Sequence, residues 1–581
     1  MHWRPWMIVS KRLGWLVWLV SALACSAESG SSSSGGGNFG QPGCVLGGDC
    51  TGCTDCFSQC KCMTGADDAS CASACGLPGG GGAAGGGGAA GGGAVGGGGA
   101  SGSSGGGGSG NEGGGGASAV GGPAAGLRVT EVAIYQGVKI PLMSQGVAVT
   151  DANAPVVSQR PALLRVFVSP DPDFAARQVV ARLELEGHPP REALRYVDRA
   201  STDSNLDSTY VFDLAADEVT LGAQYAVSLV DAAAGSYPGD AGGSRWPAQG
   251  SQPLGAEDVF GPLRVVLVPI VVNGYSPDSS AARVEAYRNK LFAMYPVRDI
   301  QIELRQAVTY SGSVSASGSG WSSALNFLLD VRANDYPQTN TYYYGMIAPA
   351  SNVGSFCGSG CVAGLSGVPS AGDSDERGSI GLGYFPGGNG YGFDPPETAA
   401  HEIGHALGRP HAPCQTNDAP PGFPYAGGGT GVWGWDLVGR KLLDPAVSTD
   451  IMGYCQNQWI SDYNYDRLFQ RISYVNANGF VVPPADPARQ PGRFRVAVVD
   501  ADGSARWEGV TRRRSHVWAD EVEVELRDGA GAVARRVRGF WFPASDTTGG
   551  RLLVPEASIA SLPGTPLVAR ASVLPAPLPL D

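Results

Sequence analysis

Residues 401–411 have the sequence HEIGHALGRPH, which holds three of the six histidines in the chain. His401 and His405 are four residues apart, so on a helix their side chains lie on one face and reach the same point. Gly408 follows where a helix end favours a left-handed residue, and the proline two positions later prevents the helix from continuing. The chain therefore turns back and brings His411 towards the other two imidazoles. This spacing predicts three nitrogen ligands around one metal ion.

The residues just before this stretch predict where its helix begins. Asp394 is a residue type that caps helices, Pro395 suits the first turn, and Glu397 completes a capping-box pattern. We therefore expect a helix over Pro395–Leu407, and its start signal is independent of the histidines. A bare His-Glu-x-x-His can arise by chance on an ordinary helix. The capped start, the glycine and the third histidine favour the metal site.

The residue types in this stretch also predict a hydrolytic reaction. Three protein ligands leave the fourth position of a tetrahedral zinc ion open for water, as in catalytic sites. Glu402 lies about 100° round the helix from His401, so it flanks the metal and is placed to act as a general base. Zinc lowers the pKa of a bound water towards about 7. The expected reaction is attack on a peptide carbonyl, with Glu402 passing the proton to the leaving amine.

The extended pattern His-Glu-x-x-His-x-x-Gly-x-x-His resembles the metzincin clan of zinc endopeptidases. Members of that clan also carry a methionine-containing turn, and residues 450–455, DIMGYC, fit it with Met452. The resemblance covers about Leu263–Tyr474. It implies an α/β (α+β) catalytic domain, one catalytic Zn²⁺, and an apolar floor formed by Met452 beneath the metal. The site residues that it implies are His401, His405 and His411 as ligands, Glu402 as the catalytic base and Gly408 as the turn residue.

Residues around the methionine turn carry further expectations. Tyr454 lies two residues after the methionine, where astacin-like and serralysin-like members have a tyrosine that swings towards the metal. We expect it to stabilise the transition state, with a core tyrosine as the equal alternative. Cys414 and Cys455 flank the third histidine and the turn, so we expect a disulfide between them. Cys357–Cys361 would then close a small loop, and the reverse pairing stays open.

Two segments before the helix have less specific patterns. Ser379–Phe385 is expected to be the edge strand along which metzincins align the substrate backbone, although its glycines disfavour a strand. Asp373, Asp375 and Glu376 predict a solvated acidic loop, with a Ca²⁺ site as the alternative.

Composition excludes some classes of protein. The chain has 581 residues and a net charge of −13, which argues against a nucleic-acid-binding protein with a basic face. Its hydrophobic content of 43% is normal for globular folds. The chain has 89 glycines, and most of the excess over an ordinary protein lies before residue 127, so the average composition describes no single domain.

The first part of the chain predicts export and a tether. Residues 1–24 have a basic start and a short apolar run, as in a signal peptide. Cys25 follows small residues and predicts a bacterial lipid anchor, with simple secretion as the alternative. Residues 25–43 form a low-complexity linker, and 76–126 a Gly-rich flexible, disordered one. Between them, 44–75 holds eight cysteines and predicts a disulfide module, with a metal-binding module as the alternative.

The remaining chain predicts three folded domains. We expect a β-sandwich over 127–260, the metzincin-like catalytic domain over 261–482, and a second sandwich-like, β-rich domain over 483–581. The first domain follows from short β-rich runs at Leu127–Val138, Ala162–Val168, Gln178–Glu186, Thr209–Leu214 and Gln224–Asp231. The second follows from alternating strands and helices at Leu263–Val271, Ser279–Tyr295, Ile300–Val308, Trp321–Ala333 and Thr341–Ala348.

Together these patterns predict an exported, surface-anchored zinc endopeptidase acting on extracellular proteins. The segment Arg160–Val168 ahead of the catalytic domain loosely resembles secreted mucin-cleaving metalloproteases, which implies glycoprotein substrates. The alternative is a non-enzymatic surface adhesin whose zinc is structural. Glu402 and an open fourth ligand position argue against that alternative, since structural zinc sites are usually closed by four protein ligands.

Overall fold

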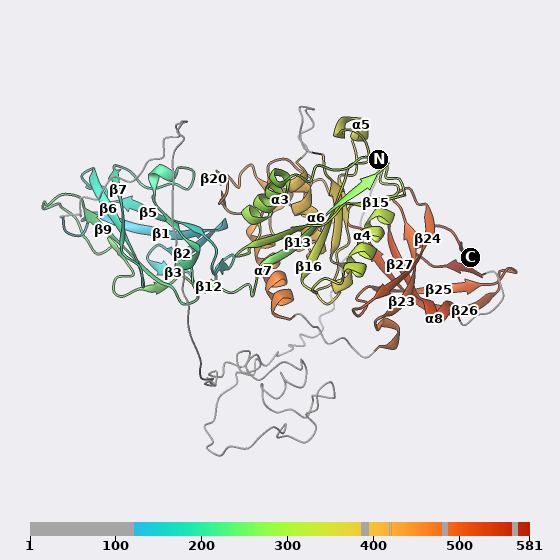
Figure 1. Cartoon of the computed structure of the whole chain (residues 1–581). Helices are drawn as coiled ribbons and strands as arrows, with labels where there is room; N and C mark the ends of the chain where they lie inside the picture. The colour runs from blue at the N-terminus through green and yellow to red at the C-terminus, as the bar shows by residue number, and fades with distance from the viewer. Residues whose placement is uncertain are drawn as a thin grey trace, which may run out of the picture. The chain divides into compact units, whose positions relative to one another are not determined.

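The computed structural model shows a strand-rich, mixed α/β protein with several sheets (Figure 1). It describes residues 121–358, 360–384, 394–416, 419, 421–478, 486–560 and 567–580. The expected signal peptide, Cys25, the cysteine-rich module and the linkers up to residue 120 lie outside the described residues. Within the described ranges, no helix is both long and apolar enough to cross a membrane.

Two antiparallel sheets form the first part of the described chain, and all five β-rich runs predicted there are confirmed as strands. The first sheet contains β1 (Leu127–Tyr135), β2 (Gly137–Ser144), β3 (Val147–Ala148), β5 (Ala162–Pro170) and β8 (Tyr210–Leu214). The second contains β6 (Arg177–Leu185), β7 (Arg191–Val197), β9 (Gln224–Asp231), β10 (Arg245–Trp246) and β11 (Gln252–Pro253). Alternate side chains of both sheets, such as Ile134 and Ala181, are buried in one shared core.

This first part is joined to the next in two ways. A later hairpin, β19 (Gly434–Asp436) and β20 (Lys441–Leu443), pairs with β2 and extends the first sheet. The buried Arg160 guanidinium donates hydrogen bonds to the carbonyls of Val297 (2.7 Å) and Phe292 (2.6 Å). Residues far apart in the sequence therefore complete one folded unit.

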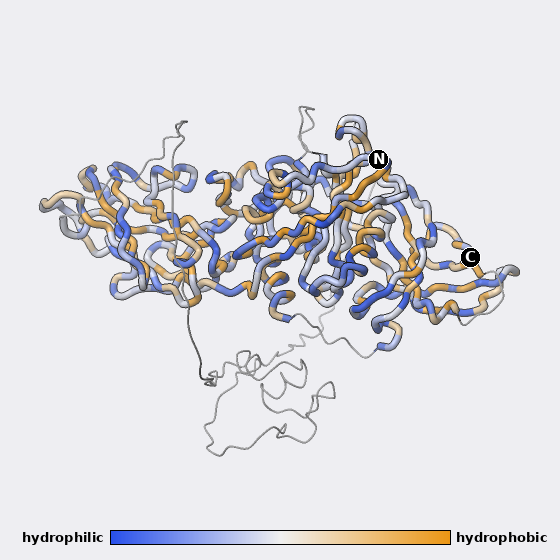
Figure 2. The backbone as a smooth tube through the Cα atoms, viewed as in Figure 1, coloured by the Kyte–Doolittle hydropathy of each residue, from blue (hydrophilic) through white to orange (hydrophobic). Residues whose placement is uncertain are grey.

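A third sheet, called the central sheet below, has strands of mixed direction. Its order is β14-β13-β16-β18-β17 with β15 beside β13, and every pair is parallel except β17 with β18. The strands are β13 (Leu263–Val272), β14 (Ile300–Leu304), β15 (Val308–Tyr310), β16 (Thr341–Ile347), β17 (Gly364–Ser366) and β18 (Gly378–Leu382). The predicted alternation of strands and helices is confirmed here. Figure 2 shows hydrophobic residues along these central strands, as expected for strands covered on both faces.

Helices cover both faces of this sheet. They are α3 (Ala281–Met294), α4 (Trp321–Asp335), α6 (Pro395–Ala406) and α7 (Asp462–Ala477). Successive residues of β13 point to opposite faces, so Leu267 packs in the core with α3, α6 and α7, while Val268 packs with α4. The sequence stretch 401–411 thus begins on a helix that is held against a rigid sheet.

The expected edge strand is wrong in position. Residues 378–382 form β18, which lies between β16 and β17 and is not an edge. The outer strand on this side is β17, and it runs antiparallel to its neighbour. Three residues, Gly364–Ser366, are too few to give a clear strand pattern in the sequence, which explains why the longer segment was favoured.

The last part of the chain forms one antiparallel sheet of seven strands, not the second sandwich expected from the sequence. Its order is β24-β23-β27-β26-β25-β28-β29. The strands are β23 (Gly492–Val499), β24 (Ala505–Arg513), β25 (Asp520–Arg527), β26 (Val533–Pro543), β27 (Gly550–Pro555), β28 (Leu567–Arg570) and β29 (Leu578–Leu580), with α8 (Glu556–Ala560) after β27. Alternate residues of β23 are buried in two different cores, one on each face of the sheet. The sequence of this strand therefore alternates as it would in a sandwich, although these strands form a single sheet.

A buried ion cluster joins this C-terminal sheet to the central sheet. Arg513 pairs with Asp373 and Glu376, and Arg551 also pairs with Glu376. Backbone amides of Arg514 and Ser515 donate to Asp375, each at 2.8 Å. The predicted solvated acidic loop is therefore wrong, because these carboxylates are buried. Two guanidinium groups already supply the positive charge that a Ca²⁺ ion would provide, so the calcium alternative is not supported.

Candidate metal centre

Helix α6 begins where the sequence predicted, but the acidic side chains of its first turn bind a neighbouring helix and do not cap α6. Asp394 is the N-cap residue, yet its side chain makes no capping hydrogen bond, so the predicted capping box is wrong. The carboxylates of Asp394 and Glu397 instead bind Lys290 of α3, at 2.8 and 3.1 Å. A tertiary ion pair thus competes successfully with the local cap and fixes α6 against its neighbouring helix.

The end of α6 brings the third histidine back to the helix. Gly408 has φ +81°, and the amide of Arg409 donates to the carbonyl of Gly404 at 2.9 Å. A β-carbon at Gly408 would also lie only 3.2 Å from the Arg471 guanidinium. The amide of Ala412 then donates to the carbonyl of Met452 at 2.8 Å, which ties the returning chain beside His411 to the methionine turn.

Backbone carbonyls set the orientation of two imidazoles. His401 Nδ1 lies 2.7 Å from the carbonyl oxygen of Ile451, and His405 Nδ1 lies 2.6 Å from that of Arg409. Because a carbonyl can only accept, each Nδ1 carries the proton and each Nε2 presents a lone pair. Burial lowers the pKa of His405 to about 3, so this imidazole is neutral and able to bind a metal at ordinary pH.

The three Nε2 atoms converge with one carboxylate. His405 Nε2 lies 3.0 Å from His401 Nε2 and 3.2 Å from His411 Nε2. An Asp546 oxygen lies 3.4 Å from His401 Nε2 and 3.1 Å from His411 Nε2. Around zinc, with metal–nitrogen distances of about 2.0–2.1 Å, tetrahedral ligand atoms are about 3.3–3.4 Å apart. Electron-rich atoms facing one another at this spacing fit a cation between them.

Asp546 was not found from the sequence, which predicted a fourth ligand position open for water. It lies in the loop between β26 and β27, in a stretch with no metal-site pattern, and its side chain is 10% exposed. Burial alone would raise the pKa of Asp546, but its contacts with His401 and His411 outweigh that effect, so the pKa lies well below its usual value. A charged carboxylate therefore completes the set of His401, His405, His411 and Asp546.

Glu402 lies beside this set, in a buried position. Its side chain is almost wholly buried, and its Oε2 atom has no hydrogen-bond partner. Burial, together with the negative charge of Asp546, raises the pKa of Glu402 well above its usual value. A methyl group at Gly364 of β17 would overlap the Glu402 carboxylate, so the absence of a side chain there makes the room for it.

Tyr454 reaches the same centre from the methionine turn. Its hydroxyl lies 2.8 Å from His411 Nε2 and donates a hydrogen bond to Asp546 at 2.5 Å. The residue is 43% exposed, so it is not packed in a core.

The methionine turn is fixed by a buried acid and a disulfide. Asp450 accepts hydrogen bonds from the amides of Met452 (2.8 Å) and Ser461 (2.9 Å), next to the short strands β21 (Thr449–Asp450) and β22 (Gln458–Trp459). Met452 is fully buried, and a β-carbon at Gly404 would come within 2.5 Å of its sulfur. The expected Cys414–Cys455 disulfide is confirmed, with a Cα–Cα distance of 5.7 Å.

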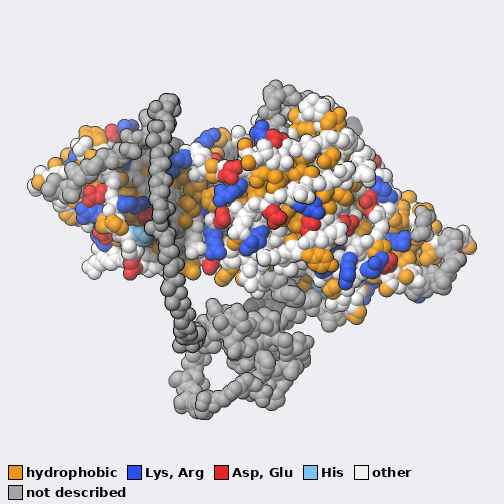
Figure 3. All heavy atoms as spheres, in the orientation of Figure 1, with side chains coloured by type: hydrophobic (Ala, Val, Ile, Leu, Met, Phe, Trp, Pro, Cys, Tyr) orange, Lys and Arg blue, Asp and Glu red, His pale blue; other side chains and the backbone are white. Residues whose placement is uncertain are grey.

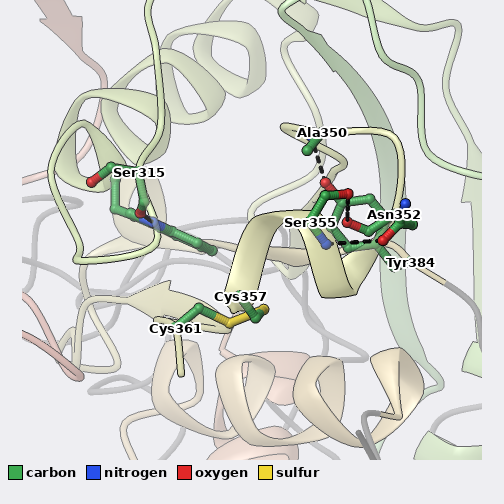
Figure 4. Close-up of a disulfide and its surroundings, with 8 residues drawn as sticks. Ser315, Ala350, Asn352, Ser355, Cys357, Cys361 and Tyr384 are labelled. Atoms are coloured by element: carbon green, nitrogen blue, oxygen red, sulfur yellow. Dashed lines mark hydrogen bonds between the residues drawn. A yellow bond between two sulfur atoms is a disulfide. The ribbon is translucent and has the colours of Figure 1, made fainter. Parts of the chain in front are cut away.

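A cavity of about 400 Å³ opens onto the centre. It is lined by Cys361–Gly364, Asp394, Glu397, Thr398, His401, Glu402, Gly453, Tyr454, Gln458 and Asp546. The second expected disulfide, Cys357–Cys361, is also confirmed, and it joins α5 (Val353–Cys357) to this wall (Figure 4). Asn352 caps α5 by accepting from the amide of Ser355 at 2.9 Å.

Comparison with known families agrees with this geometry. Residues 370–472 match the model of the family described as peptidase M66, and this range contains the three histidines, Glu402 and the methionine turn. No curated protein matches the chain. Asp546 lies outside the matched range. The match supports a peptidase of a metal-dependent family, and the cluster of three histidines and one aspartate is where the described residues can hold the metal.

Proposed function

We propose that this protein is a zinc-dependent endopeptidase of the metzincin type. The observation that carries the proposal is the convergence of three histidine Nε2 atoms next to the buried Glu402 carboxylate. Zinc suits a set of imidazoles and a carboxylate at tetrahedral spacing. His401, His405 and His411 would hold it, and Met452 would pack beneath Gly404 as the apolar floor.

The chain's own groups support hydrolysis of a peptide bond. A bound zinc ion would supply a Lewis acid for the scissile carbonyl and a more acidic water. Glu402 accepts the proton from the attacking water and passes it to the leaving amine nitrogen. Because burial raises the pKa of Glu402, its carboxylate holds a proton more readily than an ordinary glutamate, as suits a group that must accept a proton and return it. The Tyr454 hydroxyl is placed to donate a hydrogen bond to the developing oxyanion.

The alternative is a surface adhesin with a structural zinc ion, and Asp546 is the observation that favours it. Four protein ligands are typical of structural zinc sites. Against this, a structural site has no use for Glu402, whose burial with an unpaired carboxylate oxygen is costly. The family match also supports a peptidase. We therefore favour the enzyme.

Export and a surface anchor belong to the same proposal. The two disulfides are typical of proteins in oxidising compartments. Cys25 would carry the lipid, and the substrates would be extracellular proteins, including glycoproteins. A Cys25→Ser variant should move from the membrane fraction to the medium if Cys25 is the anchor, and continued membrane attachment would contradict the anchor.

The test of the activity is Glu402→Ala in the zinc-loaded full chain. Cleavage of an unstructured protein should fall by roughly 10²-fold or more, because the proton-transfer group is lost. Zinc content should stay unchanged, since Glu402 is not a ligand. Glu285→Ala, on the exposed face of α3, is the matched control and should retain full activity. Full activity in Glu402→Ala would overturn the proposed mechanism.

A further inference from the structure

The loop Ala544–Gly549, between β26 and β27, reaches from the C-terminal sheet into the metal centre. Near the middle of this loop, the Asp546 carboxylate lies 3.4 Å from Nε2 of His401, 3.9 Å from that of His405 and 3.1 Å from that of His411. Ser545 also donates a hydrogen bond to this carboxylate, and Tyr454 donates another. A carboxylate that is 10% exposed and held by two hydroxyl groups has a defined orientation and is not a mobile surface acid.

The same loop covers the free edge of β17. The amide of Ser545 donates to the carbonyl of Ser366 at 2.8 Å, and the amide of Ser366 donates to the Ser545 hydroxyl at 3.1 Å. Ala544 and Gly367 form an antiparallel bridge. The loop therefore binds the edge of β17 as an added strand does, although it comes from the other sheet.

These two contacts block the two positions that a peptide substrate would need. An extended peptide that adds to β17 would need the outward amide and carbonyl of Ser366, and the loop already pairs with both. A reacting water or carbonyl requires the fourth ligand position, and Asp546 lies there at tetrahedral spacing. The loop Ala544–Gly549 and a bound substrate therefore cannot occupy these two positions at the same time.

We propose that Asp546 is a fourth protein ligand of the metal, and that the loop Ala544–Gly549 holds the enzyme in a closed, latent state. The inference rests on the proposed zinc endopeptidase. Activation consists of withdrawal of this loop, which frees the edge of β17 and the fourth position together. The C-terminal sheet is then a regulator of the active site that the same chain supplies.

Metal binding by the full chain tests the ligand without depending on catalysis. In Asp546→Ala, zinc affinity measured by competition with a chelator should fall by on the order of 10-fold or more, because one of four ligands is lost. Cobalt substituted for zinc should show a changed visible absorption spectrum, since the fourth ligand becomes water. Thr548→Ala, at an exposed position of the same loop, is the matched control and should bind like the parent. Unchanged affinity and an unchanged cobalt spectrum in Asp546→Ala would overturn the assignment of Asp546 as a ligand.

Loop withdrawal is tested by amide hydrogen exchange and by cleavage. Exchange at Ser366 and Ser545 should become faster in Asp546→Ala and stay unchanged in Thr548→Ala. At saturating zinc, cleavage of an unstructured protein should rise by on the order of 10-fold, and adding Glu402→Ala should return it to background. A drop in cleavage would instead make Asp546 part of the active machinery and would overturn latency.

The two proposals can fail separately in these experiments. Cleavage that persists after Glu402→Ala is added would overturn the proposed mechanism of hydrolysis, while the loss of zinc affinity would still establish the ligand. Unchanged zinc affinity with Glu402-dependent cleavage would overturn the ligand and leave the endopeptidase intact.

Discussion

Gly364 and Gly404 both stand where a side chain would strike a group of the metal centre. A β-carbon at Gly404 would press on the sulfur of Met452, and one at Gly364 would overlap the carboxylate of Glu402. Gly404 lies inside the recognisable stretch, whereas Gly364 lies in a short strand with no pattern around it. At the scale of single residues, the position of Glu402, the proposed catalytic base, therefore depends on the absence of a side chain in a distant segment.

Gly364→Ala should lower cleavage without removing the metal. The added methyl group forces Glu402 to move, and a displacement of about 1 Å in a reacting group can cost roughly 10²-fold in rate. We expect a loss of at least about 10-fold, with zinc content unchanged. Gly367→Ala is the matched control, because its nearest neighbour would be 3.9 Å away. Equal rates for the two variants would show that Gly364 does not position Glu402.

At the scale of elements, the site is built from α6, the segment that follows it and the methionine turn, and a disulfide joins that segment to the turn. Cys414 follows the third histidine and Cys455 follows the turn, so the disulfide closes a loop with a sequence separation of 41 residues. Cys357–Cys361 closes a loop with a separation of only 4. The entropy that a cross-link removes from the unfolded chain grows with the length of the loop, so the two bonds should stabilise the protein unequally.

Replacing both Cys414 and Cys455 by serine should therefore destabilise the protein more than the same change at Cys357 and Cys361. The chain-entropy relation gives about 4 kcal/mol for the longer loop and about 2 kcal/mol for the shorter one. Urea unfolding under non-reducing conditions measures both variants against the parent. An equal loss in the two variants would contradict loop closure as the source of the stability.

At the scale of the whole molecule, the C-terminal sheet is attached to the central sheet by buried charges. Arg513 is 3% exposed in its side chain, and it pairs with the fully buried Asp373 and with Glu376. Other charged side chains lie at the surface, where Figure 3 shows basic and acidic groups interspersed on the face in view. Buried pairs cost much when one partner is removed, since the other charge is then left without compensation.

Arg513→Ala should destabilise the protein by about 3–5 kcal/mol, because the fully buried Asp373 loses its paired guanidinium and Glu376 loses one of its two. Arg493→Ala, which removes an exposed ion pair with Glu556, is the matched control and should leave the unfolding midpoint nearly unchanged. The measurement is urea unfolding of both variants. Similar midpoints for the two variants would show that the buried cluster contributes no more than a surface pair.

The sequence by itself determined the parts of this protein that depend on local spacing. The histidines at positions i and i+4 of a helix, the glycine that ends it and the alternation of strands and helices all act within a few residues, so their pattern is visible in the chain. The helix over residues 395–406 and the strands of the first domain agree with expectations of this kind. Both described disulfides also agree with the expected pairing.

Only the tertiary structure decided the features that join distant segments. Asp546 is 135 residues from His411, Gly364 faces Glu402 from another element, and Lys290 takes the carboxylates that local pattern assigned to a helix cap. The identity of the edge strand and the burial of Asp373 were likewise set by neighbours from elsewhere in the chain. Burial and strand pairing stabilise contacts between residues at any separation in the sequence. An aspartate in a loop without a motif therefore has no local sequence pattern that predicts its place in a metal centre.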